Sequence, residues 1–145
     1  MKITFVMGIP GSGKSHYIRE HYPDRVVYDL YTYQEKKKYL SVQEVMESYE
    51  ELKEDIVEAL KRGEDIVIEH TLLRAIRRAP YIEAIREVTD DPIDIVVLNP
   101  PIDVIKERQK ERKIYISKDN IKSNLEVLEI PTTDEGFEKV TVITE

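Results

Sequence analysis

The chain has 145 residues, a length typical of one domain, and its formal net charge of −7 comes from 22 basic and 29 acidic residues. An acidic chain is a poor sequence-independent binder of long nucleic acid, although a local basic patch could still hold one strand end. The absence of cysteine excludes disulfides and thiolate metal sites.

No apolar stretch approaches the length of a membrane span. The sequence starts at Met1-Lys2 and enters the first predicted strand at once, so we expect no signal peptide and a cytoplasmic location. Neither internal repeats nor low-complexity segments interrupt the chain, and we expect residues 1–145 to form a single domain.

The first predicted element is an apolar strand over residues 2–7, which suits a buried parallel sheet. A predicted helix that ends near Tyr22 follows the stretch Gly8-Ile9-Pro10-Gly11-Ser12-Gly13-Lys14-Ser15. The pattern G-x-x-x-x-G-K-[ST] between a strand and a helix is the P-loop, whose backbone N–H groups surround nucleotide phosphates. We expect this cradle to be formed by Gly8, Pro10, Gly11, Ser12, Gly13, Lys14, Ser15 and His16.

Two side chains carry the chemistry of this loop. Lys14 can reach the β- and γ-phosphates of a bound nucleoside triphosphate, and the hydroxyl of Ser15 can ligate Mg²⁺. His16, at the start of the helix, is expected to be a spectator or a contact on the phosphate side rather than a catalyst.

A short strand over residues 26–28 ends at Asp29. Asp29 is the candidate general base, which would orient an acceptor hydroxyl and take its proton. The alternative is an ordinary turn residue or helix cap.

Residues 30–40 are predicted to form a loop with about one turn of helix. The loop could bind a phosphorylated or stacked acceptor, or it could be a mobile surface segment. The residues concerned are Tyr31, Tyr33, Lys36, Lys37, Lys38 and Tyr39.

A capping box opens the next predicted helix, with Ser41 as the N-cap and Glu44 reaching back to it. Gly63 is expected just after the end of this helix. Apolar side chains recur along it at steps of three and four, at Val45, Tyr49, Leu52, Ile56 and Leu60.

The third predicted strand, residues 65–68, leads into Glu69-His70-Thr71. Glu69 could hold a magnesium-bound water, as Walker-B acids do. His70 could contact the acceptor or titrate near neutral pH. The alternative for His70 is a buried, hydrogen-bonded imidazole at the strand end.

Residues 74–88 are helical by pattern, and Pro80 is either the first helical residue, which we favour, or a residue inside a longer helix that it kinks. Three arginines, Arg74, Arg77 and Arg78, would then lie in the segment that enters the helix.

The remaining elements are a strand over residues 93–98, a basic helix over residues 102–112, a helix that Ser117 caps, and a last strand over residues 138–143. Arg108 and Arg112 of the basic helix are four residues apart and therefore share one face. This face is either part of a nucleotide site or a solvated basic surface, since Lys106, Lys110 and Lys113 are close in sequence.

Five strands that alternate with helices predict a three-layer α/β domain with a mostly parallel sheet. Ligands bind such sheets at the carboxyl ends of the strands. We therefore expect the P-loop, Asp29, Glu69-His70 and Asn99 to surround one crevice.

Taken in order, these residues resemble the P-loop kinases of the polynucleotide-kinase-like group, also described as small AAA-type kinases. The resemblance covers nearly the whole chain. It rests on the P-loop, Asp29, the segment I-V-I-E-H-T-L-L-R, the Arg108/Arg112 pair, and the tail E-I-P-T-T-D-E-G-F-E-K-V. It implies the strand order 2-3-1-4-5 and the use of ATP and Mg²⁺ for transfer of the γ-phosphoryl group to a hydroxyl. It further implies that Asp29 acts as the base and that both arginines belong to a lid over the nucleotide.

Two departures from this family leave the acceptor open. Relatives usually carry Asp-Thr where this chain has His70-Thr71, and those that act on polynucleotides tend to carry an arginine soon after the base, where residues 30–33 have none. The acceptor is either a 5′-hydroxyl nucleic-acid end or a small molecule such as a nucleoside or sugar. Two other functions compete, a nucleotide-binding ATPase or switch without an acceptor and a zeta-toxin-like kinase.

Overall fold

The structure is a computed structural model that describes residues 1–111 and 118–145, with the backbone alone for residues 111 and 118–121. The predicted positions of Arg112 and of the Ser117 cap therefore lie outside the described residues. The strands are β1 (Ile3–Met7), β2 (Val26–Asp29), β3 (Ile66–His70), β4 (Ile93–Leu98) and β5 (Lys139–Ile143). The helices are α1 (Lys14–His21), α2 (Leu30–Gln34), α3 (Val42–Lys61), α4 (Ala75–Arg86), α5 (Ile102–Glu111) and α6 (Lys118–Val127), with a 3-10 turn at Thr133–Glu135.

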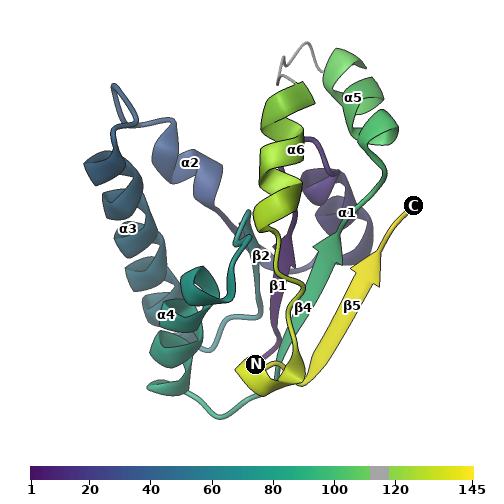
Figure 1. Ribbon diagram of the computed structural model, residues 1–145. Coiled ribbons are helices and arrows are strands. Elements are labelled where there is room, and N and C mark those ends of the chain that lie inside the picture. Colours follow the sequence, from purple (N-terminus) through teal and green to yellow (C-terminus); the bar gives the residue numbers. More distant parts are fainter. Residues whose placement is uncertain (112–117) are drawn as a thin grey trace.

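All five strands pair in parallel in the order β2-β3-β1-β4-β5, which confirms the predicted sheet. The register places Met7 beside His70 and Asp29 beside Glu69. The carboxyl ends of β1, β2 and β3 therefore meet at one edge of the sheet, and the arrowheads of β4 and β5 point the same way (Figure 1).

Helices cover both faces of the sheet because alternate strand residues point to opposite sides. Phe5 and Met7 belong to the larger apolar cluster, which they share with Leu52 of α3 and Ile82 of α4. Val6, between them, packs instead with Ile18 of α1 in a second cluster. This arrangement confirms the predicted three-layer α/β class.

The β-strand core residues are almost fully buried, as a parallel sheet with two covered faces requires. No helix in the described part of the chain combines the length and the apolar composition of a membrane span.

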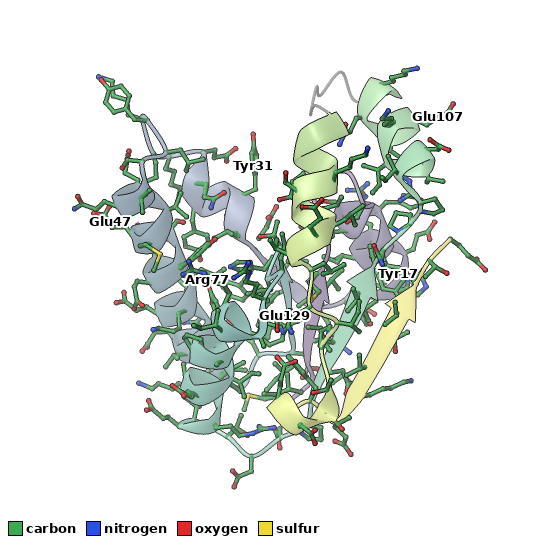
Figure 2. The ribbon with its side chains drawn as sticks, in the orientation of Figure 1. Tyr17, Tyr31, Glu47, Arg77, Glu107 and Glu129 are labelled. Atoms are coloured by element: carbon green, nitrogen blue, oxygen red, sulfur yellow. The ribbon has the colours of Figure 1, made fainter. Side chains whose placement is uncertain are left out.

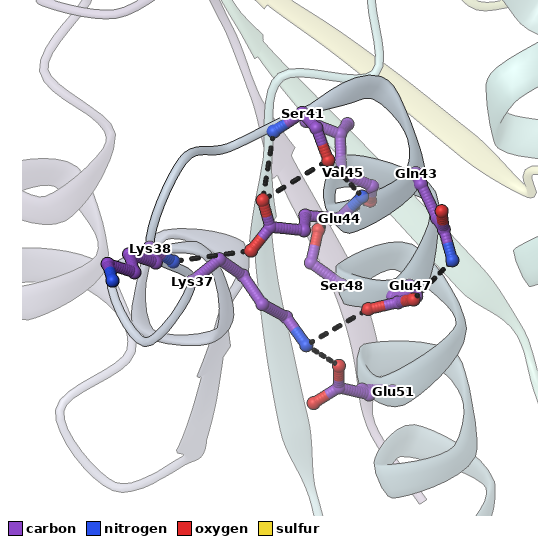
Figure 3. Close-up of polar contacts among 9 residues, drawn as sticks. All are labelled: Lys37, Lys38, Ser41, Gln43, Glu44, Val45, Glu47, Ser48 and Glu51. Atoms are coloured by element: carbon purple, nitrogen blue, oxygen red, sulfur yellow. Dashed lines mark hydrogen bonds and ion pairs between the residues drawn. The ribbon is translucent and has the colours of Figure 1, made fainter.

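The capping box at Ser41 is confirmed (Figure 3). The Ser41 hydroxyl accepts a hydrogen bond from the backbone of Glu44, and the Glu44 carboxylate accepts one from the backbone of Ser41, each 3.2 Å long. Gly63 follows the helix with a φ of 80°, as its C′ position requires.

The expected turn of helix after Asp29 is α2. The basic segment that follows it, Lys36 to Lys38, is attached to α3 through Lys37. Lys37 forms ion pairs with Glu51 and, at 3.7 Å, with Glu47 (Figure 3). Lys36 lies over the ring of Tyr33 and Lys38 over the ring of Tyr39. Lys37 is therefore used to hold this loop in place, and the role of the segment in binding an acceptor stays a prediction.

The favoured prediction that Pro80 begins a helix is wrong, because α4 starts at Ala75 and Pro80 lies inside it, as in the alternative with a longer helix. The first turn of α4 contains Arg78, whose side chain is 1% exposed and ties this turn to the rest of the domain. Its Nη1 donates to the carbonyl of Leu72 at 2.7 Å, and its Nε donates to the Glu135 carboxylate at 2.7 Å. Pro80 is tolerated on the exposed side of the helix, where only one backbone N–H is lost.

Candidate active site

The loop between β1 and α1 has backbone geometry that only glycine adopts easily. Gly11 and Gly13 have φ values of 87° and 99°. A Cβ atom at Gly8 would lie 2.4 Å from the Ser12 hydroxyl oxygen, and one at Gly13 would lie 2.7 Å from Nη1 of Arg108. The loop therefore forms a cradle of backbone atoms at the start of α1, where the helix dipole favours an anion.

The side chain of Lys14 folds back onto this loop. Its Nζ donates hydrogen bonds to the carbonyl oxygens of Gly8, at 2.7 Å, and Ile9, at 3.2 Å. The Ser12 hydroxyl is buried and has no hydrogen-bond partner among the residues that the structure describes. The Lys14 ammonium and the Ser12 hydroxyl thus lie beside a loop whose glycines expose its backbone. This combination suits the binding of nucleotide phosphates.

The carboxyl ends of β2 and β3 bring two carboxylates next to this loop. Asp29 and Glu69 are register partners at the ends of their strands, and the Ser15 hydroxyl donates to Oε1 of Glu69 at 2.7 Å. Burial raises the pKa of Glu69 above its ordinary value, the hydrogen bond from Ser15 lowers it, and the charge of Asp29 raises it further. A hydroxyl and a carboxylate in contact form the hard oxygen donor set that suits Mg²⁺.

Asp29 has a structural task as well. Its Oδ1 accepts a hydrogen bond of 2.9 Å from the backbone of Tyr31, so Asp29 is the N-cap of α2. The helix-cap alternative is thus realised, and the role of Asp29 as a base stays a prediction.

These groups line one cavity of about 310 Å³. Tyr31 stands exposed at its edge, on the side of α2 that faces α6 (Figure 2). The cavity is lined by Pro10, Lys14, Ser15, Asp29, Leu30, Tyr31, Gln34, Glu69, His70 and Thr71.

His70 is the buried imidazole of the alternative interpretation, with 2% of its surface exposed. Its Nδ1 accepts a hydrogen bond of 3.1 Å from the backbone of Leu72, so the neutral ring carries its proton on Nε2, 3.2 Å from the Tyr81 hydroxyl. Burial and the charge of Lys14 lower the pKa of His70 to about 3. The prediction that His70 titrates near neutral pH is therefore wrong.

Helix α5 lies against the outer side of the P-loop. Nη1 of Arg108 donates to the carbonyl of Ser12 at 2.5 Å, and the side-chain amide of Gln109 donates to the carbonyl of Pro10 at 3.4 Å. The structure thus brings Arg108 to the loop, whereas Arg112 lies outside the described residues. Gln109 was not predicted from the sequence, because a glutamine between charged residues gives no signal of burial.

A second cavity of about 350 Å³ lies on the α1 side of the loop. His16 is at its edge, 64% exposed, and its Nε2 lies 2.9 Å from the Glu20 carboxylate. This pairing orients the imidazole of His16 toward Glu20, one turn further along α1. The lining comprises Ser12, Gly13, His16, Tyr17, Glu20, Leu98, Arg108, Ile143 and Glu145.

Comparisons with solved structures find several kinases of the same fold. A sugar kinase from a Janibacter species has 20% identity and a TM-score of 0.70, with 99% of this chain and 85% of that chain covered. A gluconokinase from Sinorhizobium meliloti has 18% identity and a TM-score of 0.71, with coverages of 99% and 82%. A chain of the Pnkp1/Rnl/Hen1 RNA repair complex has 19% identity and a TM-score of 0.76, with 94% of this chain but only 46% of that chain covered.

A comparison with curated proteins gives no match. Residues 3–131 match the family described as an AAA domain, which is most of the chain and includes the P-loop, Asp29, Glu69 and Arg108. The chain therefore belongs to this AAA-domain family, whose P-loop kinase fold it shares.

Proposed function

We propose that the protein is a Mg²⁺-dependent kinase that transfers the γ-phosphoryl group of ATP to a hydroxyl acceptor. The observation that carries this proposal is the single cavity where Lys14 and Ser15 of the P-loop meet Asp29 and Glu69 at the strand ends. Hydrolysis alone does not require a second carboxylate at this place, whereas transfer to a hydroxyl is assisted by one.

The P-loop binds and orients the nucleotide in this proposal. Backbone N–H groups at the start of α1 hold the phosphates, and the Lys14 ammonium exchanges its carbonyl partners for phosphate oxygens. Ser15 and Glu69 are the residues that would hold Mg²⁺, which when bound neutralises charge on the phosphates. Among the described residues, no group of three or more His, Asp or Glu side chains is placed to hold a metal alone.

Asp29 is the proposed base. Its carboxylate accepts the proton of the acceptor hydroxyl while the hydroxyl oxygen forms a bond to the γ-phosphorus and the bond to the β-phosphate oxygen breaks, releasing ADP. Arg108, beside Ser12, and Arg112 are proposed to stabilise the charge that develops on the transferred group.

The names of the structural neighbours support a phosphotransferase and leave the acceptor class to experiment, since they include a sugar kinase, a gluconokinase and an RNA repair protein. Incubation with γ-labelled ATP and oligonucleotide, nucleoside or sugar acceptors tests the proposal, with Lys14→Ala as the inactive control. We expect label to appear in one acceptor class. Label that appears only as free phosphate would contradict the proposal and favour an ATPase or switch.

A zeta-toxin-like kinase is the second candidate, because it uses the same P-loop arrangement. It predicts that expression of the protein inhibits growth and that Lys14→Ala removes the inhibition. Normal growth on expression of the active protein would exclude it.

A further inference from the structure

A third cavity, of about 520 Å³, opens next to the one at Lys14 and Asp29. Both cavities are lined by His70 and Thr71, so these two residues lie where the cavities meet. Tyr49 of α3 and Val127 of α6 also line this cavity. Each volume lies in or near the range of small-ligand pockets, about 300 to 1,000 Å³.

The charged groups of this cavity are all of one sign. Its lining contains Arg74 and Arg77 and, among the described residues, no carboxylate. This is unusual in a chain with 29 acidic and 22 basic residues. A concave wall with two guanidinium groups and no acid attracts anions.

Neither arginine forms an ion pair with a described residue. Arg74 is the N-cap residue of α4 and its side chain makes no capping hydrogen bond. Nη1 of Arg77 donates to the sulfur of Met46 at 3.7 Å, a weak interaction that leaves the guanidinium without an acidic partner in the described part of the chain. Arg77 lies in the first turn of α4 (Figure 2). The next arginine, Arg78, differs because it is buried and paired with Glu135.

We propose that Arg74 and Arg77 bind an oxyanion group, carboxylate or phosphate, of a small acceptor molecule whose hydroxyl reaches Asp29. This inference rests on the proposed kinase function and assigns its substrate class. The guanidinium group suits the task because its planar set of N–H donors binds two oxyanion oxygens at once. Three further residues of the lining, Leu72, Leu73 and Ile76, are apolar and offer a surface against which the carbon skeleton of an acceptor can pack.

The same observations favour a small anion over a nucleic-acid chain. The net charge of −7 opposes a polyanion along an extended surface, and Lys37 of the basic loop between α2 and α3 is already paired with Glu47 and Glu51. Two neighbouring, solvent-accessible arginines in a cavity that shares His70 and Thr71 with the cavity at Lys14 instead match one anionic group on one molecule.

The test compares acceptors that share a carbon skeleton and differ in charge. One pair is a sugar acid and the corresponding sugar alcohol, and the other is a sugar phosphate and the free sugar, each with γ-labelled ATP. We expect the anionic member of one pair to be phosphorylated with a KM about tenfold to a hundredfold lower than that of its neutral counterpart. Whichever pair shows this preference identifies the oxyanion as carboxylate or phosphate.

Two variants connect that preference to the arginines. Arg74→Gln and Arg77→Gln should each raise the KM for the anionic acceptor about tenfold and leave the KM for ATP unchanged. Arg19→Gln is the matched control, because Arg19 is exposed on α1 and lines neither cavity. An unchanged acceptor KM in both cavity variants, or equal use of neutral acceptors, would overturn the inference.

A binding measurement separates this inference from the kinase proposal. Calorimetric titration of the same sugar acid and sugar phosphate into Lys14→Ala protein removes the P-loop cation from the comparison. Binding that Arg74→Gln and Arg77→Gln weaken in this background supports the anion site even if no acceptor is phosphorylated, in which case the kinase proposal alone fails. Absence of arginine-dependent binding of either anion overturns the anion site.

Discussion

The hydroxyl of Ser15 donates a 2.7 Å hydrogen bond to the carboxylate of Glu69, joining the start of α1 to the end of β3. The two residues are 54 positions apart and meet because β1 and β3 are parallel neighbours. Glu69 is buried beside a second carboxylate, Asp29, which raises its pKa. A carboxylate kept in such a place needs a compensating charge, and a divalent cation is the partner that the proposed function supplies.

The first prediction concerns this pair. Glu69→Gln keeps an oxygen that can accept from Ser15 and removes the negative charge. We expect the Mg²⁺ concentration for half-maximal transfer to rise about tenfold or more, as measured by a metal titration at saturating ATP. Glu54→Gln, an exposed change on α3, is the control. The same Mg²⁺ dependence in both variants would show that Glu69 does not hold the metal.

The elements of the fold could be predicted because their local signals agree with the tertiary structure. The apolar runs of β1 and β4, the capping box at Ser41 and the glycine after α3 specify their structures within a few residues of sequence. The order of the strands was available only through the family resemblance, since spacing alone does not determine which strands become neighbours.

The errors occur where contacts distant in sequence decide the outcome. Pro80 is a strong local signal for a helix start, yet Arg78 is already helical two residues before it and forms a buried ion pair with Glu135. The pKa of His70 depends on burial and on Lys14, neither of which can be read near position 70. Gln109 reaches Pro10 across 99 residues of sequence, so its place at the P-loop could not be predicted.

Asp29→Asn provides a test of the proposed base. Asparagine caps helices as well as aspartate, so α2 should remain in place while the proton acceptor is lost. We expect the transfer rate to fall about 10²- to 10⁴-fold with ATP affinity within about threefold of the parent protein. Rapid-quench kinetics and nucleotide titration measure the two quantities. A collapse of ATP affinity would instead identify Asp29 as a structural residue or metal ligand.

Arg108 and Arg112 are predicted to act on the transferred phosphoryl group. Arg108→Ala and Arg112→Ala should each lower kcat about a hundredfold and raise the KM for ATP much less. Lys110→Ala, an exposed change on the same helix, should have little effect on either constant. Steady-state kinetics separate these outcomes, and an unchanged kcat would assign the arginine concerned to the solvated basic face.

The buried imidazole of His70 predicts a loss of stability in mild acid. Its pKa is about 3 in the folded protein and about 6.5 in an unfolded chain, so below pH 6.5 protons bind the unfolded state preferentially. The contribution of neutral His70 to the free energy of unfolding is complete above pH 6.5 and decreases as the pH falls toward 3. Between pH 7 and pH 5 the free energy of unfolding should fall by about 2 kcal/mol through His70.

Urea titrations at the two pH values measure this effect, and His70→Asn separates it from the contributions of the carboxyl groups. The variant should be less stable at pH 7, because it loses the hydrogen bond from Leu72 and the packing against Tyr81, but its stability should depend less on pH. An equal loss of stability between pH 7 and pH 5 in both proteins would mean that His70 binds a proton in the folded state. The pH profile of transfer should likewise show no ionisation of His70 between pH 5 and pH 8.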